Sequence, residues 1–177
     1  MSVSLANGRL KPIPTRTIQP PEGSLAGLTW AHFVNDGAAN FLPGVLPLVL
    51  VSMGVPVALA GALMAALLMG QALQPVTGWL ADKVGGRVLI TFGVAGSSLG
   101  GMLVALAPSL WTLVPSLVLI GVANSSFHPP AMASARLLGA GRQGRAMSIM
   151  LVGGEIGRGL WPLLASAVAS GPGLRWV

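Results

Sequence analysis

The decapeptide Gly78-Trp-Leu-Ala-Asp-Lys-Val-Gly-Gly-Arg87 (GWLADKVGGR) is a short charged connection between two long apolar stretches. Its glycines permit a tight turn, and its acid and two bases favour water over lipid. The simplest interpretation is a basic turn that orients the two flanking helices, for which Lys83 and Arg87 would suffice. The chain is therefore expected to leave a membrane here and to re-enter it.

Apolar stretches of similar length follow one another along the rest of the chain. A hydrocarbon core of about 30 Å requires roughly 20 residues at a helical rise of ~1.5 Å. Continuous apolar runs without strict alternation favour helices over barrel strands. The sequence therefore predicts an all-α integral membrane protein with about five transmembrane helices. They are expected at residues 25–51, 57–80, 88–107, 110–135 and 146–169.

Composition supports a membrane protein and explains the basic charge. Of the 177 residues, 53% are hydrophobic and only 8% are charged, whereas soluble proteins carry about 25% charged residues. The net charge of +6 raises nucleic acid as a partner, but most bases fall in segments that share one side of the membrane. This pattern predicts a multi-pass protein of the inner (plasma) membrane with a cytoplasmic N-terminus, bound to lipid and not to nucleic acid. The bases expected in the cytoplasm are Arg9, Lys11, Arg16, Lys83, Arg87, Arg136, Arg142 and Arg145.

The chain divides into a polar tail and a helical part. Residues 1–24 contain four prolines among polar and basic side chains, which predicts a disordered cytoplasmic tail. Residues 25–177 form the transmembrane part, with 171–177 as the lead-in to a sixth helix. The chain has no cysteine and no catalytic triad, HExxH motif or carboxylate pair outside the membrane. We therefore expect neither an enzyme nor a bound cofactor or metal.

Three polar side chains share one face of the first predicted helix. His32, Asp36 and Asn40 follow one another at i, i+4 spacing, and Asp36 lies about 16 Å along the helix from Leu25, close to the membrane midplane. An ionisable group at that depth costs about 2.5–3.5 kcal/mol on insertion scales. This face is therefore expected to look into the bundle or into a water-filled path.

The fifth predicted helix carries a second pair of charges. Glu155 and Arg158 are i, i+3 neighbours and can neutralise each other. One interpretation is a packing ion pair. The other is that Arg158 binds an anionic group or tunes the proton affinity of Glu155 and Asp36.

The fourth predicted helix contains His128 directly before Pro129 and Pro130. The two prolines lack backbone donors, so they are expected to break the helical ladder and to free carbonyls that need partners inside the protein. His128 could cap one of these carbonyls, or it could change protonation, since imidazole titrates near neutral pH. Both interpretations remain open. Gly96-x-x-x-Gly100 and Gly153-x-x-x-Gly157 predict close helix packing.

Several of these segments resemble a known family. GWLADKVGGR resembles the loop between helices 2 and 3 of the major facilitator superfamily, G-x-L-A-D-(R/K)-x-G-(R/K)-(R/K), with Gly86 in place of a base. HFVNDGAANFLPGVLPLVL (32–50), SSFHPPAMA (125–133) and GRAMSIMLVGGEIGRGLWPLL (144–164) resemble its fosmidomycin-resistance group of drug-efflux facilitators. The resemblance runs from about residue 25 to 177.

The resemblance implies a proton-coupled exporter that works by alternating access. It implies a coupling or substrate path through Asp36, His128, Glu155 and Arg158, which we extend to His32 and Asn40 on the Asp36 face. It also implies that the loop acts as a conformational latch. The latch residues are Gly78, Asp82, Lys83, Gly85 and Arg87.

The resemblance covers only part of the family's twelve-helix design. Such transporters consist of two six-helix bundles with the substrate site between them. The sequence thus predicts most of an N-terminal bundle that acts on a small-molecule substrate. Its expected partner is a C-terminal half transporter chain or a second copy of itself. Two alternatives remain, namely a membrane interaction subunit that transports nothing and an inactive truncated transporter fragment.

Overall fold

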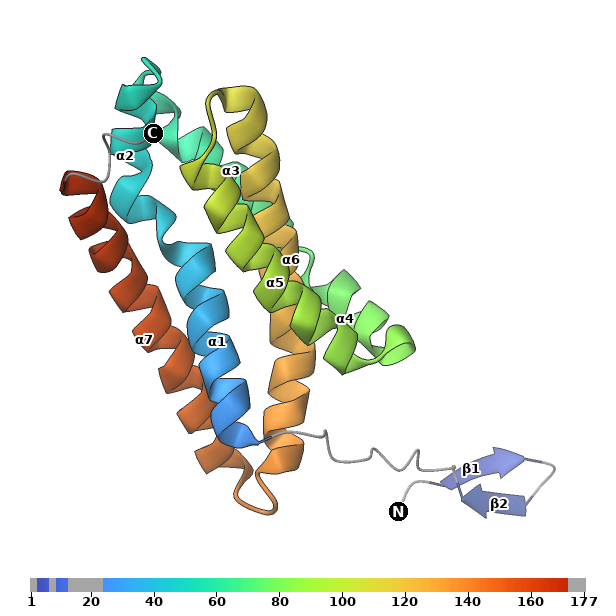
Figure 1. Ribbon diagram of the computed structural model, residues 1–177. Helices are drawn as coiled ribbons and strands as arrows, with labels where there is room; N and C mark the ends of the chain where they lie inside the picture. The colour runs from blue at the N-terminus through green and yellow to red at the C-terminus, as the bar shows by residue number, and fades with distance from the viewer. Residues whose placement is uncertain (1–2, 7–8, 13–23, 172–177) are drawn as a thin grey trace.

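The computed structural model describes residues 3–6, 9–12 and 24–171, and most of them are helical. The helices form an elongated bundle (Figure 1). Their bounds are α1 Leu25–Asn40, α2 Leu42–Ser52, α3 Ala60–Gln71, α4 Gln74–Val84, α5 Gly86–Ala105, α6 Leu110–Leu138 and α7 Gln143–Ser170, with a 3-10 turn η1 at Val57–Leu59. An all-α membrane fold is thereby confirmed.

The first predicted transmembrane helix consists of two consecutive helices. Ser24 caps α1, because its hydroxyl accepts a hydrogen bond from the Gly27 amide at 3.0 Å. The helix is interrupted at Phe41, and α2 starts directly afterwards with Pro43 in its first turn. Proline lacks the amide that would continue the ladder, which accounts for an interruption at this point.

The second predicted helix is also divided, and this changes the place of the GWLADKVGGR segment. The helix α3 ends at Gln71 and α4 begins at Gln74, with Pro75 in its first turn. Residues 78–84 are the last turns of α4, so Gly85 alone connects α4 to α5. Gly85 has a φ of 97°, a region that favours glycine. The segment expected as a loop is therefore mostly helix.

The helix α6 continues through the two prolines, so the expected break is wrong. It is unbroken from Leu110 to Leu138. A side chain of a neighbouring helix replaces the backbone donor that Pro129 lacks. The Thr77 hydroxyl of α4 donates to the Ser125 carbonyl at 2.7 Å. Ser125 lies four residues before Pro129 and would otherwise have no ladder partner. The expectation that the freed carbonyl finds a partner inside the protein is thus confirmed.

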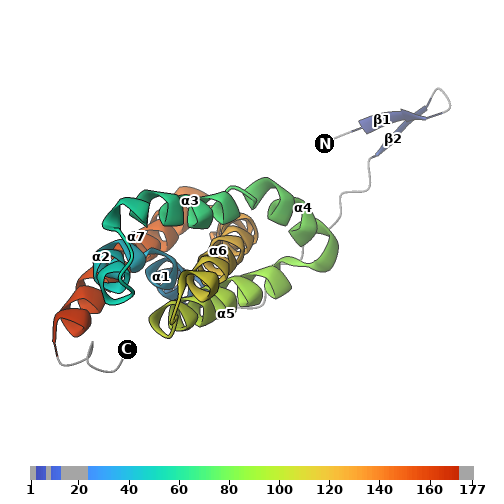
Figure 2. The same ribbon diagram turned by 90° about the horizontal axis from the view of Figure 1, so that it is seen from above.

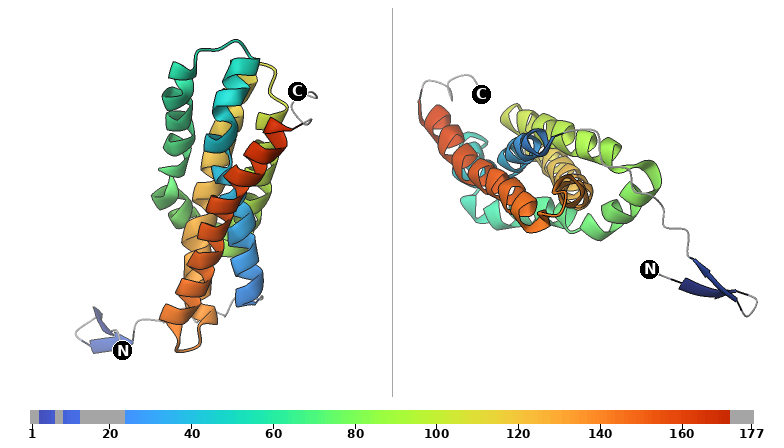
Figure 3. Two further views of the ribbon diagram at one scale, coloured as in Figure 1. Left: turned by 90° about the vertical axis from the view of Figure 1, so that its left-hand side faces the viewer. Right: turned by 90° about the horizontal axis from the view of Figure 1, so that it is seen from below.

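Within the described residues, four segments are long and apolar enough to cross a membrane. The fifth predicted span, α7, is as long as the others at 28 residues. It is less apolar, because it contains Arg145, Glu155 and Arg158 together with many small residues. It nevertheless lies beside α1 along the bundle (Figure 3). The four segments are Leu25–Ser52, Val57–Val84, Gly86–Ala105 and Leu110–Leu138.

Small residues bring the helices of the bundle close together. The helix α6 is central and packs on α5, α3, α4, α7 and α1 (Figure 2). A Cβ on Gly96 or Gly100 of α5 would collide with Ala123 or Ile120 of α6. Similarly, a Cβ on Gly153 or Gly157 would collide with the backbone of α1. Both predicted close-packing faces are therefore confirmed.

Part of the tail expected to be disordered forms a small hairpin. The strands β1 Val3–Ala6 and β2 Arg9–Pro12 pair in antiparallel fashion, with Ala6 opposite Arg9. The intervening sequence is Asn7-Gly8, a strong hairpin signal that the proline content of the tail concealed. Residues 13–23 of the tail lie outside the described residues, as do residues 172–177 of the predicted lead-in to a sixth helix at 171–177.

Candidate functional site

Asp36 lies at the centre of a polar cluster inside the bundle. It belongs to α1, and only 1% of its side chain is exposed. Its neighbours His32 and Asn35 on the same helix are buried as well. A carboxylate at this place has lost its water, so it must be compensated by hydrogen bonds and positive charge from the protein.

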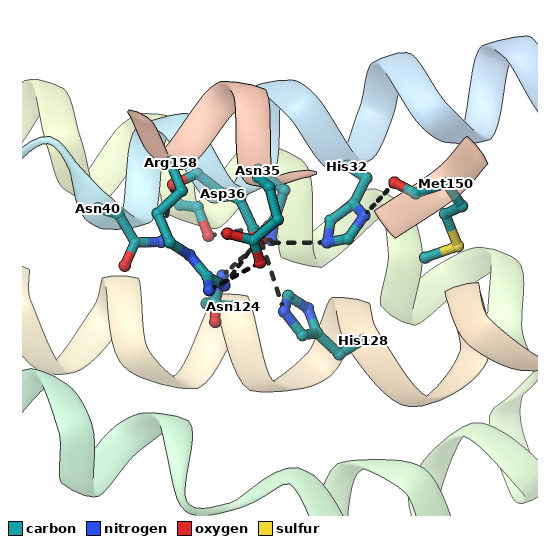
Figure 4. Close-up of polar contacts among 10 residues, drawn as sticks. His32, Asn35, Asp36, Asn40, Asn124, His128, Met150 and Arg158 are labelled. Carbon is teal, nitrogen blue, oxygen red and sulfur yellow. Dashed lines mark hydrogen bonds and ion pairs between the residues drawn. The ribbon is translucent and has the colours of Figure 1, made fainter. Parts of the chain in front are cut away.

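That compensation comes from three directions (Figure 4). From α7, Arg158 Nη2 donates to Asp36 Oδ2 at 2.9 Å. From α6, His128 Nε2 lies 3.5 Å from Asp36 Oδ1. From α1 itself, His32 Nε2 lies 3.3 Å from Oδ2 one turn away. His32 and Asp36, which the sequence places on one helix face, are thus in contact, and Asp36 has two further partners from distant segments.

Arg158 joins two acids that differ in burial. Its second terminal nitrogen, Nη1, donates to Glu155 Oε1 at 3.0 Å, as the i, i+3 spacing indicated. The Arg158 side chain is 46% exposed and that of Glu155 is 65% exposed. The guanidinium thus spans from the buried carboxylate of Asp36 to an exposed one. The interpretation as a packing pair alone is incomplete, because Arg158 also neutralises Asp36.

The two histidine rings are held differently. His32 Nδ1 lies 2.9 Å from the Met150 carbonyl of α7. A carbonyl can only accept, so Nδ1 carries the proton and Nε2 is directed at Asp36. Gly154 makes room for this ring, since a Cβ there would collide with it. His128 Nδ1 is buried and has no hydrogen-bond partner among the described residues. His128 therefore contacts Asp36 and does not cap a carbonyl.

Three amide and hydroxyl groups complete the cluster, and sequence reasoning missed them. Asn35 Nδ2 and Asn124 Nδ2 donate to Asp36 Oδ1 at 3.1 and 3.4 Å. The Ser97 hydroxyl of α5 donates to Asn35 Oδ1 at 3.1 Å. A signal for Asn124 was available, because it precedes His128 by four residues on one helix face. No comparable pattern marks Ser97.

Asn40 has a different role from the one expected. Its amide donates to the backbone carbonyl of Asp36 at 2.8 Å, one turn earlier on α1. This contact supports the end of α1, where the chain passes Phe41 into α2. Asn40 is therefore close to the cluster in Figure 4 but does not contact the carboxylate.

Comparison with known proteins assigns the family. The family model described as Major Facilitator Superfamily matches residues 28–177. The chain belongs to the Major Facilitator Superfamily. No solved structure matches the chain.

Curated relatives in this superfamily include transporters linked to drug resistance. The fosmidomycin resistance protein of Escherichia coli (strain K12) is 31% identical over 147 residues, which are 82% of this chain and 36% of the relative. The uncharacterized MFS-type transporter YfnC of Bacillus subtilis (strain 168) is 28% identical over 162 residues, 89% of this chain and 40% of the relative. A multidrug resistance protein B homolog of Mycobacterium tuberculosis is 32% identical over 104 residues, 58% of this chain and 19% of that protein. The chain thus spans about two fifths of the length of the first two relatives.

The signature segment of this superfamily member lies at one end of the bundle. A cavity of about 1370 Å³ is lined there by residues 78 and 81–87, the start of α1 and the end of α6. Lys83 Nζ lies 3.8 Å from the centre of the Trp79 ring in a cation–π contact. The structure brings Gly78, Asp82, Lys83, Gly85 and Arg87 to one cavity wall. Their role as a latch remains a prediction.

Proposed function

We propose that this chain is the N-terminal portion of a proton-coupled secondary transporter that exports a drug or another small molecule by alternating access. The Asp36 cluster is its coupling site. The observation that supports this proposal best is the convergence of His32, His128 and Arg158 on one buried carboxylate. Ionisable groups inside a membrane protein are costly and mark proton or substrate paths.

The chemistry of the cluster suits reversible proton binding. His32 holds a proton on Nδ1 and directs Nε2 at Asp36, so one further proton is shared between an imidazole and a carboxylate. Binding that proton weakens the attraction between Asp36 and Arg158. Because Arg158 also contacts Glu155, it can shift toward Glu155 when Asp36 becomes neutral. Proton binding is thereby linked to a movement of α7 relative to α1.

The exposed charges of α7 indicate a partner surface. Glu155 and Arg158 lie in the middle of a helix that packs along the bundle, yet about half or more of each side chain is uncovered. Charges in this position do not face hydrocarbon and require protein or a water-filled path. We assign this surface to a C-terminal half transporter chain or a second copy, with the substrate bound between the two bundles.

The charge distribution sets the proposed orientation. Lys83 and Arg87 lie at the junction of α4 and α5, whereas Arg136, Arg142 and Arg145 lie at or beside the junction of α6 and α7. The beginning of α1 lies at the same end of the bundle as the α6–α7 junction (Figure 3). We place this end in the cytoplasm and the protein in the inner membrane, in keeping with the positive-inside rule. In this orientation, the cavity lined by the signature segment lies on the cytoplasmic side of the protein.

Transport in proteoliposomes tests the proposal. The chain is reconstituted alone and together with the C-terminal half of the Escherichia coli relative, with a pH-sensitive dye trapped inside. Addition of fosmidomycin is expected to cause proton flux in at least one of the two preparations. Asp36→Asn is expected to abolish this flux, because it preserves the shape of the side chain but removes the proton-binding carboxylate.

Ser148→Ala is the matched control, since this exposed serine of α7 bonds only within its own helix, to the Gly144 carbonyl. Its flux is expected to equal that of the unaltered chain. Fosmidomycin is one of several drugs to be tried, because the relatives' names refer to multidrug resistance as well. If no drug drives proton flux in either preparation, or if Asp36→Asn transports normally, the proposal is wrong.

A further inference from the structure

We propose that His32, Asp36 and His128 form a binding site for a first-row divalent cation of the zinc type, and that Arg158 competes with this cation. One ring nitrogen of each histidine and one carboxylate oxygen of Asp36 lie within 4.8 Å of one another. Two imidazoles and a carboxylate are ligands typical of zinc. The inference concerns equilibrium binding at the cluster and does not require that the chain transports anything.

The spacing of the ligand atoms fits a tetrahedral ion. Zinc binds imidazole nitrogen and carboxylate oxygen at about 2.0–2.2 Å, which places neighbouring ligand atoms of a tetrahedron about 3.4 Å apart. The observed distances are 3.3 Å from His32 Nε2 to Asp36 Oδ2 and 3.5 Å from His128 Nε2 to Asp36 Oδ1, and three ligand atoms, one per residue, lie within 4.8 Å of one another. Binding of one ion therefore requires these ligand atoms to close by up to about 1.4 Å, which small rotations of the two rings supply.

The tautomer of His32 is compatible with a cation. With the proton on Nδ1 held by the Met150 carbonyl, a neutral ring directs its Nε2 lone pair at Asp36 Oδ2. Two acceptors facing each other at 3.3 Å repel unless a proton or a metal cation lies between them. A backbone carbonyl on the far nitrogen is also the usual support of a histidine that binds a metal.

Arg158 supplies the competing charge. Its guanidinium neutralises Asp36 in the structure and would repel a divalent ion at the same carboxylate. Glu155 offers an alternative partner, which Arg158 already contacts at 3.0 Å. Cation binding is therefore expected to transfer Arg158 fully to Glu155. Removal of Arg158 and removal of the Glu155 charge then change metal affinity in opposite directions.

The composition of the chain makes the site easy to test. His32 and His128 are its only histidines, and it has no cysteine, so no other imidazole or thiolate site can form. The full chain without an affinity tag is titrated with ZnCl₂ by calorimetry in detergent, and with Co²⁺ by visible absorption. One zinc per chain and intense tetrahedral Co²⁺ bands are expected. MgCl₂ is expected to give no binding, since magnesium prefers oxygen ligands.

Four variants and a control separate the site from nonspecific binding. His32→Gln and His128→Gln are each expected to weaken zinc binding about 10- to 100-fold, and helix content by circular dichroism checks that they fold. Arg158→Gln is expected to tighten binding about tenfold and Glu155→Gln to weaken it. Ser148→Ala, at an exposed position of α7 outside the cluster, is the control and leaves the affinity unchanged. Absence of Co²⁺ bands in both the unaltered chain and Arg158→Gln would overturn the proposal, as would zinc binding that His32→Gln does not alter.

Discussion

The chain has two regions rich in charge, and they are built in opposite ways. The GWLADKVGGR segment at 78–87 is continuous in sequence, lies at the end of the bundle and exposes most of its side chains. The Asp36 cluster draws on α1, α5, α6 and α7, and its central carboxylate is buried. The first region is recognisable from ten consecutive letters, whereas the second exists only when four helices are packed together.

This difference separates the family signature from the proposed coupling site. A local segment identifies the superfamily because its pattern survives without any tertiary contact. A buried cluster depends on helix packing. Substitution of any of its members is therefore expected to change the free energy of unfolding measurably. Changes around Asp36 are therefore expected to cost more free energy of unfolding than changes in the signature segment.

The largest effect is expected where α7 approaches α1. In Gly157→Val the new side chain would collide with the Phe33 carbonyl, pushing α7 away from the cluster. Overpacking of this kind costs about 1–3 kcal/mol or more, and reversible unfolding in mixed detergent micelles measures it.

The matched control is Gly159→Val, two residues further along the same helix. Nothing lies within 4 Å of a Cβ at Gly159, so its unfolding free energy is expected to change by less than about 0.5 kcal/mol beyond the difference in helix propensity. Equal losses in the two variants would show that the close approach of α7 and α1 is not what stabilises the cluster.

A smaller effect is expected from the hydroxyl of Ser97. Ser97→Ala leaves the buried Asn35 Oδ1 without its donor, which costs about 1–2 kcal/mol. The neighbouring Ser98 is exposed, so Ser98→Ala serves as the control and is expected to be neutral. If both alanine variants unfold alike, the hydrogen bond from Ser97 to Asn35 contributes nothing to stability.

The smallest effect is expected in the signature segment. Lys83→Gln removes the cation above the Trp79 ring, an exposed contact worth about 0.5–1 kcal/mol at most. The same unfolding assay measures it, and Ala81→Gln in the same turn of α4 serves as a control for the substitution itself. A loss as large as that of Gly157→Val would contradict the contrast between the two regions.

The sequence predicts the parts of this fold that rest on local rules. Apolar length places the helices, and i, i+4 spacing pairs His32 with Asp36. Glycine spacing identifies the faces at Gly96 and Gly153 that pack closely. Each of these predictions uses residues that are close together in the sequence, either within one apolar stretch or at a spacing of four.

What the sequence does not predict depends on long-range packing. One interpretation of the sequence has Arg158 act on Asp36, but the two residues are 122 positions apart, and their contact at 2.9 Å exists only because α7 packs on α1. The donor that replaces the missing amide of Pro129 comes from Thr77, a residue of another helix. A lone serine such as Ser97 gives no sign of its partner, because its burial is decided by a neighbouring helix.

The contacts of α7 with α1 also form a two-point attachment. Met150 holds the ring of His32, and Arg158 holds Asp36, at positions about 12 Å apart along α7. A helix tied at two points can pivot about either one, but a tilt that keeps the first contact must lengthen the second. The charge on Asp36 determines the strength of the second contact, which is the ion pair between Arg158 and Asp36. In the proposed mechanism, a single proton or ion on Asp36 sets the inclination of α7, and a local change of charge becomes a displacement at the ends of a helix of 28 residues.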